Sequence, residues 1–173
     1  MNILILNGSP RSKGNTAAMI AAFAQGARDS GHQITVVDAA QKKIAGCLGC
    51  EFCHTKGNGQ CVQKDDMQEI YPLLETADML VLASPIYYFG FSGQLECVIH
   101  RTYAVGIPSN LKKAALLLSS GADEVYGGAI YEYQHAFLEY MHLEDMGVFT
   151  AHGMENRSEK KLEELRQFGL SLK

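Results

Sequence analysis

The sequence Ile3-Leu4-Ile5-Leu6, followed one residue later by Gly8-Ser9-Pro10-Arg11-Ser12-Lys13-Gly14-Asn15-Thr16, decides the fold. The apolar run is typical of a parallel strand that helices cover on both faces. The loop leads into an amphipathic segment, so its free backbone N–H groups converge at the positive end of a helix dipole. The stretch therefore predicts a first βα unit with an anion site at its junction.

The same alternation continues along the chain and predicts one α/β domain over residues 1–173. Further strands are expected at 34–37, 79–83, 114–118 and 147–150, and helices at 16–30, 66–76, 92–103, 126–141 and 155–168. Pro72 should kink or split the second helix. Capping boxes are expected at Asp65 or Asp66 and at Asn156 with Glu159. The economical architecture is a doubly wound, five-stranded parallel sheet of order 2-1-3-4-5.

Composition limits the partners. The 173 residues carry a net charge of -4, with 47% hydrophobic and 20% charged residues. An acidic protein does not favour nucleic acid or an anionic membrane, and no apolar run is long enough to cross a bilayer. With no basic region ahead of the first strand, a cytoplasmic location is expected.

Four of the five cysteines follow the pattern C-x2-C-x2-C-x7-C. Cys47, Cys50, Cys53 and Cys61 lie in an insertion at about 44–64, after the second strand. Thiolates at such spacings are ligands of iron-sulfur clusters and of structural zinc, so the segment predicts a metal or redox centre. Two disulfides, or four small apolar residues, are the alternative, which a reducing cytosol disfavours. Cys97 lies among apolar helix residues and is expected in the core.

Two loops predict a flavin site. The first offers donors for one phosphate: Ser9, Arg11, Ser12, Asn15 and Thr16. It matches neither the dinucleotide fingerprint nor the ATPase loop. The other, Ser84-Pro85-Ile86-Tyr87-Tyr88-Phe89-Gly90-Phe91, follows the third strand and borders the same crevice in a sheet of this order. A phosphate cradle opposite aromatic rings suits flavin mononucleotide (FMN), whereas ordinary turns and core packing are the plainer interpretation.

These loops, with Ser92-Gly93-Gln94-Leu95, resemble the NADPH-dependent FMN reductases of the flavodoxin-like superfamily. The cysteine pattern and Asp65-Asp66-Met67 are similar to the iron-sulfur flavoproteins within it. The resemblance implies a 4Fe-4S cluster on Cys47, Cys50, Cys53 and Cys61, and a flavin ring along residues 85–89, the loop Pro85, Ile86, Tyr87, Tyr88 and Phe89. Ser119, Ser120 and Gly121 would complete the pocket. This chain departs from many relatives at Glu96 and at His100-Arg101.

The resemblance implies an FMN-dependent oxidoreductase that moves electrons between ferredoxin or NAD(P)H and a small acceptor. The alternatives are a cluster-free NAD(P)H-dependent FMN or quinone reductase and a flavin-binding redox sensor. No catalytic side chain is assigned. The cysteine loop is expected to be held only at its ends, near the flavin crevice, and the rings of Tyr87, Tyr88, Phe89 and Phe91 to be exposed. A homodimer or larger assembly that buries both is therefore expected.

Overall fold

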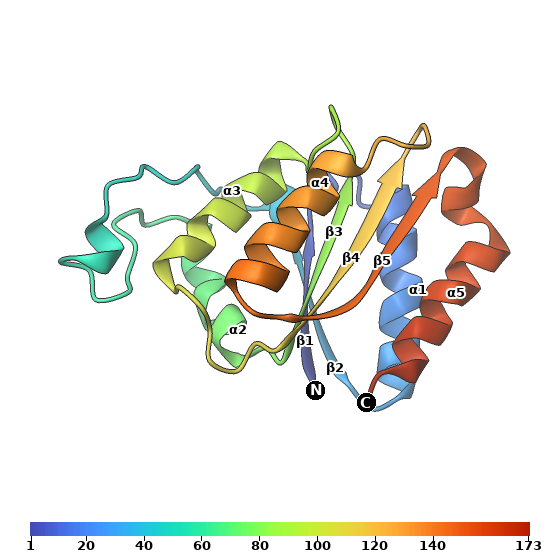
Figure 1. Cartoon of the computed structure of the whole chain (residues 1–173), viewed down its shortest axis with the longest axis horizontal. Helices are drawn as coiled ribbons and strands as arrows, with labels where there is room; N and C mark the ends of the chain where they lie inside the picture. Colours follow the sequence, from blue (N-terminus) through green and yellow to red (C-terminus); the bar gives the residue numbers. More distant parts are fainter.

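The computed structural model describes all 173 residues and contains one parallel sheet of order β2-β1-β3-β4-β5 (Figure 1). This confirms the predicted flavodoxin-like fold. The strands are β1 (Asn2–Asn7), β2 (Gln33–Asp38), β3 (Met79–Pro85), β4 (Lys113–Ser120) and β5 (Glu144–His152). The fifth strand is longer than predicted, and its pairing with β4 slips by a residue at a bulge where Gly147 has φ 128°.

Helices cover both faces of the sheet, as its three central, continuously apolar strands β1, β3 and β4 require. One face carries α1 (Asn15–Asp29) and α5 (Glu159–Ser171), and the other carries α2 (Tyr71–Thr76), α3 (Gly93–Arg101) and α4 (Gly127–Glu132) (Figure 1). Successive strand side chains alternate between the two cores. Ile3 and Ile5 pack under α1, whereas Leu4 and Leu6 pack under the other helices.

Two glycines let α1 and α5 pack unusually closely. A Cβ atom on Gly26 would lie 2.0 Å from the Arg166 carbonyl oxygen, and one on Gly169 would lie 2.3 Å from that of Phe23. No side chain fits at either position. The contact places α5, and the turn before it, beside the start of α1.

Several helix boundaries differ from the predictions. Pro72 does split the second helix, which becomes a 3-10 turn at Asp66–Glu69 and the short α2. The segment expected at 126–141 changes after α4 into a π-helix, Tyr133–Tyr140. The Asn156 capping box is wrong, because Ser158 caps α5 and accepts a hydrogen bond from Lys161 N. At the other predicted cap, Asp65 accepts one from Met67 N. No helix is long and apolar enough to span a membrane.

Candidate functional site

A cavity of about 640 Å³ opens where β1, β3, β4 and β5 end. The carboxyl edge beside the switch point is where doubly wound sheets bind their ligands. Of the predicted site residues, eleven line this cavity: Ser9, Arg11, Ser12, Asn15, Thr16, Pro85, Ile86, Tyr87, Ser119, Ser120 and Gly121. The sequence therefore identified three loops that the fold brings together.

The start of α1 offers uncommitted hydrogen-bond donors to this cavity. Gly14 is the N-cap and no side chain caps the helix. Five backbone N–H groups donate to no acceptor in the chain, those of Ser12, Lys13, Asn15, Thr16 and Ala17. Together with the helix dipole and the exposed guanidinium of Arg11, they form an anion site.

Internal hydrogen bonds fix the shape of this loop. Ser9 N donates to Asn7 Oδ1 at 2.9 Å, and Arg11 N donates to Ser9 Oγ at 3.2 Å. The buried Thr16 hydroxyl lies 2.8 Å from Ser119 Oγ, which joins the first loop to the end of β4. A ligand thus meets a loop that is already ordered, and little conformational entropy is lost on binding.

The aromatic loop contributes less to the cavity than predicted. A turn closed by two hydrogen bonds between Tyr87 and Gly90 puts Tyr88 and Phe89 at left-handed φ values of 49° and 68°. Neither residue lines the cavity, and Tyr88 is fully exposed. Phe91 was expected to be exposed, but it is buried at 4% exposure because the chain turns inward after Gly90.

Three cavity residues were not predicted as site residues from the sequence, namely Gly153, Asn156 and Arg157. Arg157 donates through Nε to Asn15 Oδ1 at 3.0 Å and through Nη2 to the Lys13 carbonyl. Its guanidinium thereby braces the loop and adds a positive charge there. The topology could have predicted these three residues, since residues that directly follow β5 lie at the same edge of a parallel sheet as those that follow β1, β3 and β4.

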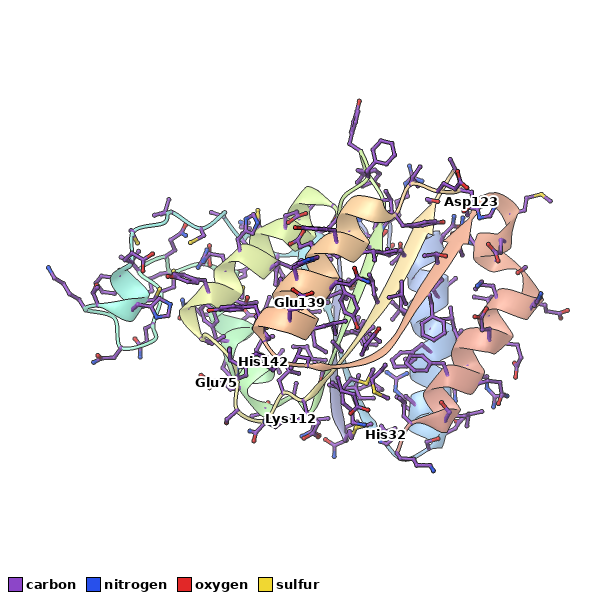
Figure 2. All side chains as sticks on the ribbon, in the orientation of Figure 1. His32, Glu75, Lys112, Asp123, Glu139 and His142 are labelled. Atoms are coloured by element: carbon purple, nitrogen blue, oxygen red, sulfur yellow. The ribbon has the colours of Figure 1, made fainter.

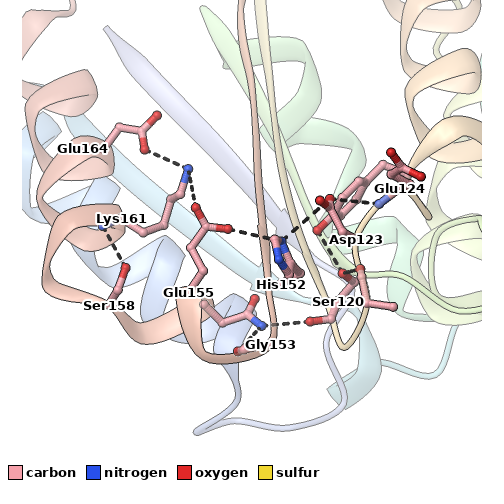
Figure 3. A network of polar contacts seen from close by, with 12 residues as sticks. Ser120, Asp123, Glu124, His152, Gly153, Glu155, Ser158, Lys161 and Glu164 are labelled. Atoms are coloured by element: carbon pink, nitrogen blue, oxygen red, sulfur yellow. Dashed lines mark hydrogen bonds and ion pairs between the residues drawn. The ribbon is translucent and has the colours of Figure 1, made fainter.

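A polar network beside the cavity joins the loops after β4 and β5 (Figure 3). Asn156 donates to the carbonyls of Ser120 and Gly153 at 2.8 and 2.9 Å. His152 Nδ1 lies 3.3 Å from Glu155 Oε2 and 3.7 Å from Asp123 Oδ1. These contacts hold the far wall of the cavity in place.

The cysteine segment leaves the sheet on the other side of α3 (Figure 1). No residue from 44 to 64 lines the cavity, so no cysteine of the segment borders the crevice of its own chain. The segment is held at more than its ends. Tyr103, just after α3, contacts the segment at two points. Its carbonyl oxygen lies 2.8 Å from His54 Nε2, and its hydroxyl donates to the Glu51 carboxylate.

A buried arginine clasps the base of the segment. Arg101, 1% exposed, donates to both carboxylate oxygens of Asp65 at 2.7 and 3.0 Å and to the Ala45 carbonyl at 3.0 Å. Burial alone would raise the pKa of Asp65, but hydrogen bonds from Arg101, Ala45 N and Met67 N hold it below its usual value.

The side chains of the segment 44–64 and of its base suit a metal-sulfur group held by cysteine thiolates. All four cysteines are free thiols: Cys47 and Cys50 are exposed, whereas Cys53 and Cys61 pack against the core. No three of their sulfurs lie within 4.8 Å of one another. Two buried polar atoms at the base of the segment, Tyr71 Oη and Arg101 Nε, have no hydrogen-bond partner. Free donors beside soft ligands suit an anionic sulfur group.

A doubly wound sheet with an anion-binding helix start at its switch point defines a flavodoxin-like protein with a cofactor-type cleft. The family model described as NADPH-dependent FMN reductase matches residues 1–155, and the chain belongs to that family. Within it, the sequence is 37% identical over 126 residues to an iron-sulfur flavoprotein of Archaeoglobus fulgidus, covering 73% of this chain and 51% of that protein. The chain spans about half the length of the curated relatives that it matches first.

Solved structures share the fold at low sequence identity. An NAD(P)H:quinone oxidoreductase from Methanothermobacter marburgensis aligns with a TM-score of 0.74 at 19% identity, over 100% of this chain and 96% of the other. An FMN-dependent NADH-azoreductase from Bacillus anthracis, solved in complex with FMN, aligns with a TM-score of 0.71 at 14% identity, over 98% of both chains.

Proposed function

We propose that the protein is an FMN-dependent oxidoreductase that passes electrons between NAD(P)H or ferredoxin and a small acceptor, through a 4Fe-4S cluster on Cys47, Cys50, Cys53 and Cys61. The observation that carries the flavin assignment is the uncapped start of α1, whose free N–H groups face a cavity at the switch point. Bound FMN would supply two-electron and one-electron chemistry, which suits an exchange with a one-electron cluster.

The chain's own residues would bind and orient the cofactor. The N–H groups at the start of α1 and the Arg11 side chain would hold the phosphate dianion. Ile86 and Tyr87, on the opposite wall, would pack against the ring, and the loop from Ser119 to Gly121 would approach its polar edge. No protein side chain needs to act as a nucleophile.

The flavin assignment is tested by measuring FMN affinity. Arg11→Ala should weaken binding by about 1–3 kcal/mol, which is the worth of a charge-assisted hydrogen bond. Thr16→Ala should also weaken it, because the hydroxyl joins the loop to Ser119. Arg28→Ala is the matched control, since it removes an exposed arginine at the other end of the same helix. Parental affinity in both cavity variants would place the flavin elsewhere.

The cluster assignment is tested separately, by iron and acid-labile sulfide analysis of protein purified without oxygen. Serine at Cys47, Cys50, Cys53 or Cys61 should lower iron content and leave FMN bound, because the two sites use separate loops. Cys97→Ser is the control, since Cys97 lies on α3 outside the segment. Iron loss in that variant would reassign the ligands.

A cluster-free NAD(P)H-dependent quinone or FMN reductase is the second candidate. The separated sulfurs favour it, as does the full-length structural match to a quinone oxidoreductase. It predicts turnover with NAD(P)H and a quinone in protein that lacks iron and sulfide. A redox sensor would instead bind FMN and turn over with no donor.

The proposed working unit is a homodimer or a larger assembly. Two features support it: the segment at 44–64 contributes nothing to its own chain's cavity, and the rings of Tyr87, Tyr88 and Phe89 are exposed. A partner's segment would meet the flavin of this chain. A monomer in light scattering that still reduced its cluster through its own flavin would contradict this. A cytoplasmic location is proposed as well, because a reducing cytosol keeps the four cysteines available as ligands.

A further inference from the structure

Two helices bring three metal-ligating side chains together, away from the cavity and the cysteine segment. Glu96 and His100 occupy one face of α3 at a spacing of four residues, and Glu132 is the last residue of α4. One ligand atom from each lies within 4.8 Å of the other two, and no other set of three His, Cys, Asp or Glu side chains in the chain does so. We infer that Glu96, His100 and Glu132 bind a divalent first-row metal ion.

The spacing of the three groups suits one ion. Carboxylate oxygen and imidazole nitrogen bind such ions at about 2.0–2.2 Å, so two ligands of one ion are at most about 4.4 Å apart. Shifts of a few tenths of an ångström in side-chain position would therefore complete the coordination. One histidine with two carboxylates is a donor set for ions such as Mn²⁺, Fe²⁺ or Zn²⁺, and it leaves positions open to water.

Core packing holds the three positions. Leu95 and Ile99, the neighbours of Glu96 and His100 along α3, are buried, and so is Tyr133, which follows Glu132. Ser92 caps α3 and also donates to the Gly8 carbonyl at 2.6 Å. The backbone beneath the ligands is thus fixed before any ion arrives, which lowers the entropic cost of binding.

The two carboxylates of this cluster carry negative charge that no lysine or arginine neutralises. Glu96 and Glu132 are both half-buried, and neither has a lysine or arginine within 4 Å. The sole ion-pair contact of Glu96 is His100 Nε2 at 3.6 Å, and Glu132 has none. Two half-buried carboxylates that face each other repel unless a cation or a proton lies between them. Burial, and then the nearby Glu96, raise the pKa of Glu132 to about 7, so a proton is the competing occupant.

Mn²⁺ binding, followed by electron paramagnetic resonance of the free ion, tests the inference at pH 8. Mn²⁺ is the probe because thiolates bind it poorly, so the cysteine segment does not compete. The full-length protein should bind one ion per chain. Glu96→Gln, His100→Ala and Glu132→Gln should each weaken binding at least about ten-fold, the smallest loss usual even for an outer-shell change.

A matched control lies on the π-helix. His135 and Glu139 form an exposed pair with the same spacing, 3.9 Å between Nε2 and Oε2, but without a third ligand, and Glu139 projects from that helix in Figure 2. His135→Ala and Glu139→Gln should leave Mn²⁺ affinity unchanged, although Glu139→Gln removes the same charge as Glu132→Gln. Absence of saturable binding, or an equal loss in the control variants, would overturn the inference. FMN content should be unchanged in all five variants.

Discussion

Replacement of Arg101 by methionine should destabilise the protein strongly, because Arg101 is a buried cation with a single carboxylate partner. Methionine keeps much of the side-chain volume and removes three hydrogen bonds, two to Asp65 and one to the Ala45 carbonyl. Removal of one partner of a buried pair costs about 3–5 kcal/mol. Asp65 keeps two backbone donors and its side chain is 19% exposed, so about 3 kcal/mol is expected. That is a large share of the roughly 5–15 kcal/mol by which proteins are stable.

Urea unfolding followed by circular dichroism would measure this loss. Arg166→Met is the control, because Arg166 pairs with Asp29 at 3.0 Å on the surface, where such a pair is worth at most about 1 kcal/mol. Asp65→Asn combined with Arg101→Met should cost less than the sum of the single changes, since the unpaired charge is gone. A loss below about 1 kcal/mol in Arg101→Met, or additive losses in the double variant, would refute the reasoning.

Three further outcomes are expected. Gly26→Ala should lower the melting temperature, at a cost of about 1–3 kcal/mol, because its Cβ would lie 2.0 Å from the Arg166 carbonyl oxygen; a stabilised variant would contradict the close packing of α1 and α5. Tyr133→Phe should cost about 1 kcal/mol in urea unfolding, because it removes a buried hydroxyl that donates to Asp145 at 2.8 Å, and no change would mean that the bond contributes nothing. Because Arg101 and its neighbours lower the pKa of Asp65, that carboxylate contributes stability above its unfolded pKa of about 3.8, lost as pH falls further. An acid titration should show a smaller loss in Arg101→Met than in the parent, because only the backbone donors Ala45 N and Met67 N then lower the pKa of Asp65.

The sheet could be predicted because its strands are continuous apolar runs, and the cavity loops because strand ends meet at one edge. Other features depend on distant partners. Arg157 is an ordinary surface arginine in the sequence, and only folding brings it to Asn15. Asp65 was interpreted as a helix cap, which it is, but nothing local shows that the same carboxylate also binds Arg101. Phe91 belongs to an aromatic run, and a tight turn alone separates it from its exposed neighbours.

The hydrogen bonds from Arg157 to the loop at the start of α1 form only after most of the chain has been made. These hydrogen bonds, to Lys13 and Asn15, join positions 144 and 142 residues apart. During synthesis the N-terminal βα unit emerges first, and the loop at the start of α1 exists long before α5 has been translated. Contacts of such long range form late, because the loop-closure entropy is lost before any contact offsets it. A nascent chain therefore carries a loop without these two hydrogen bonds until residue 157 has emerged and folded.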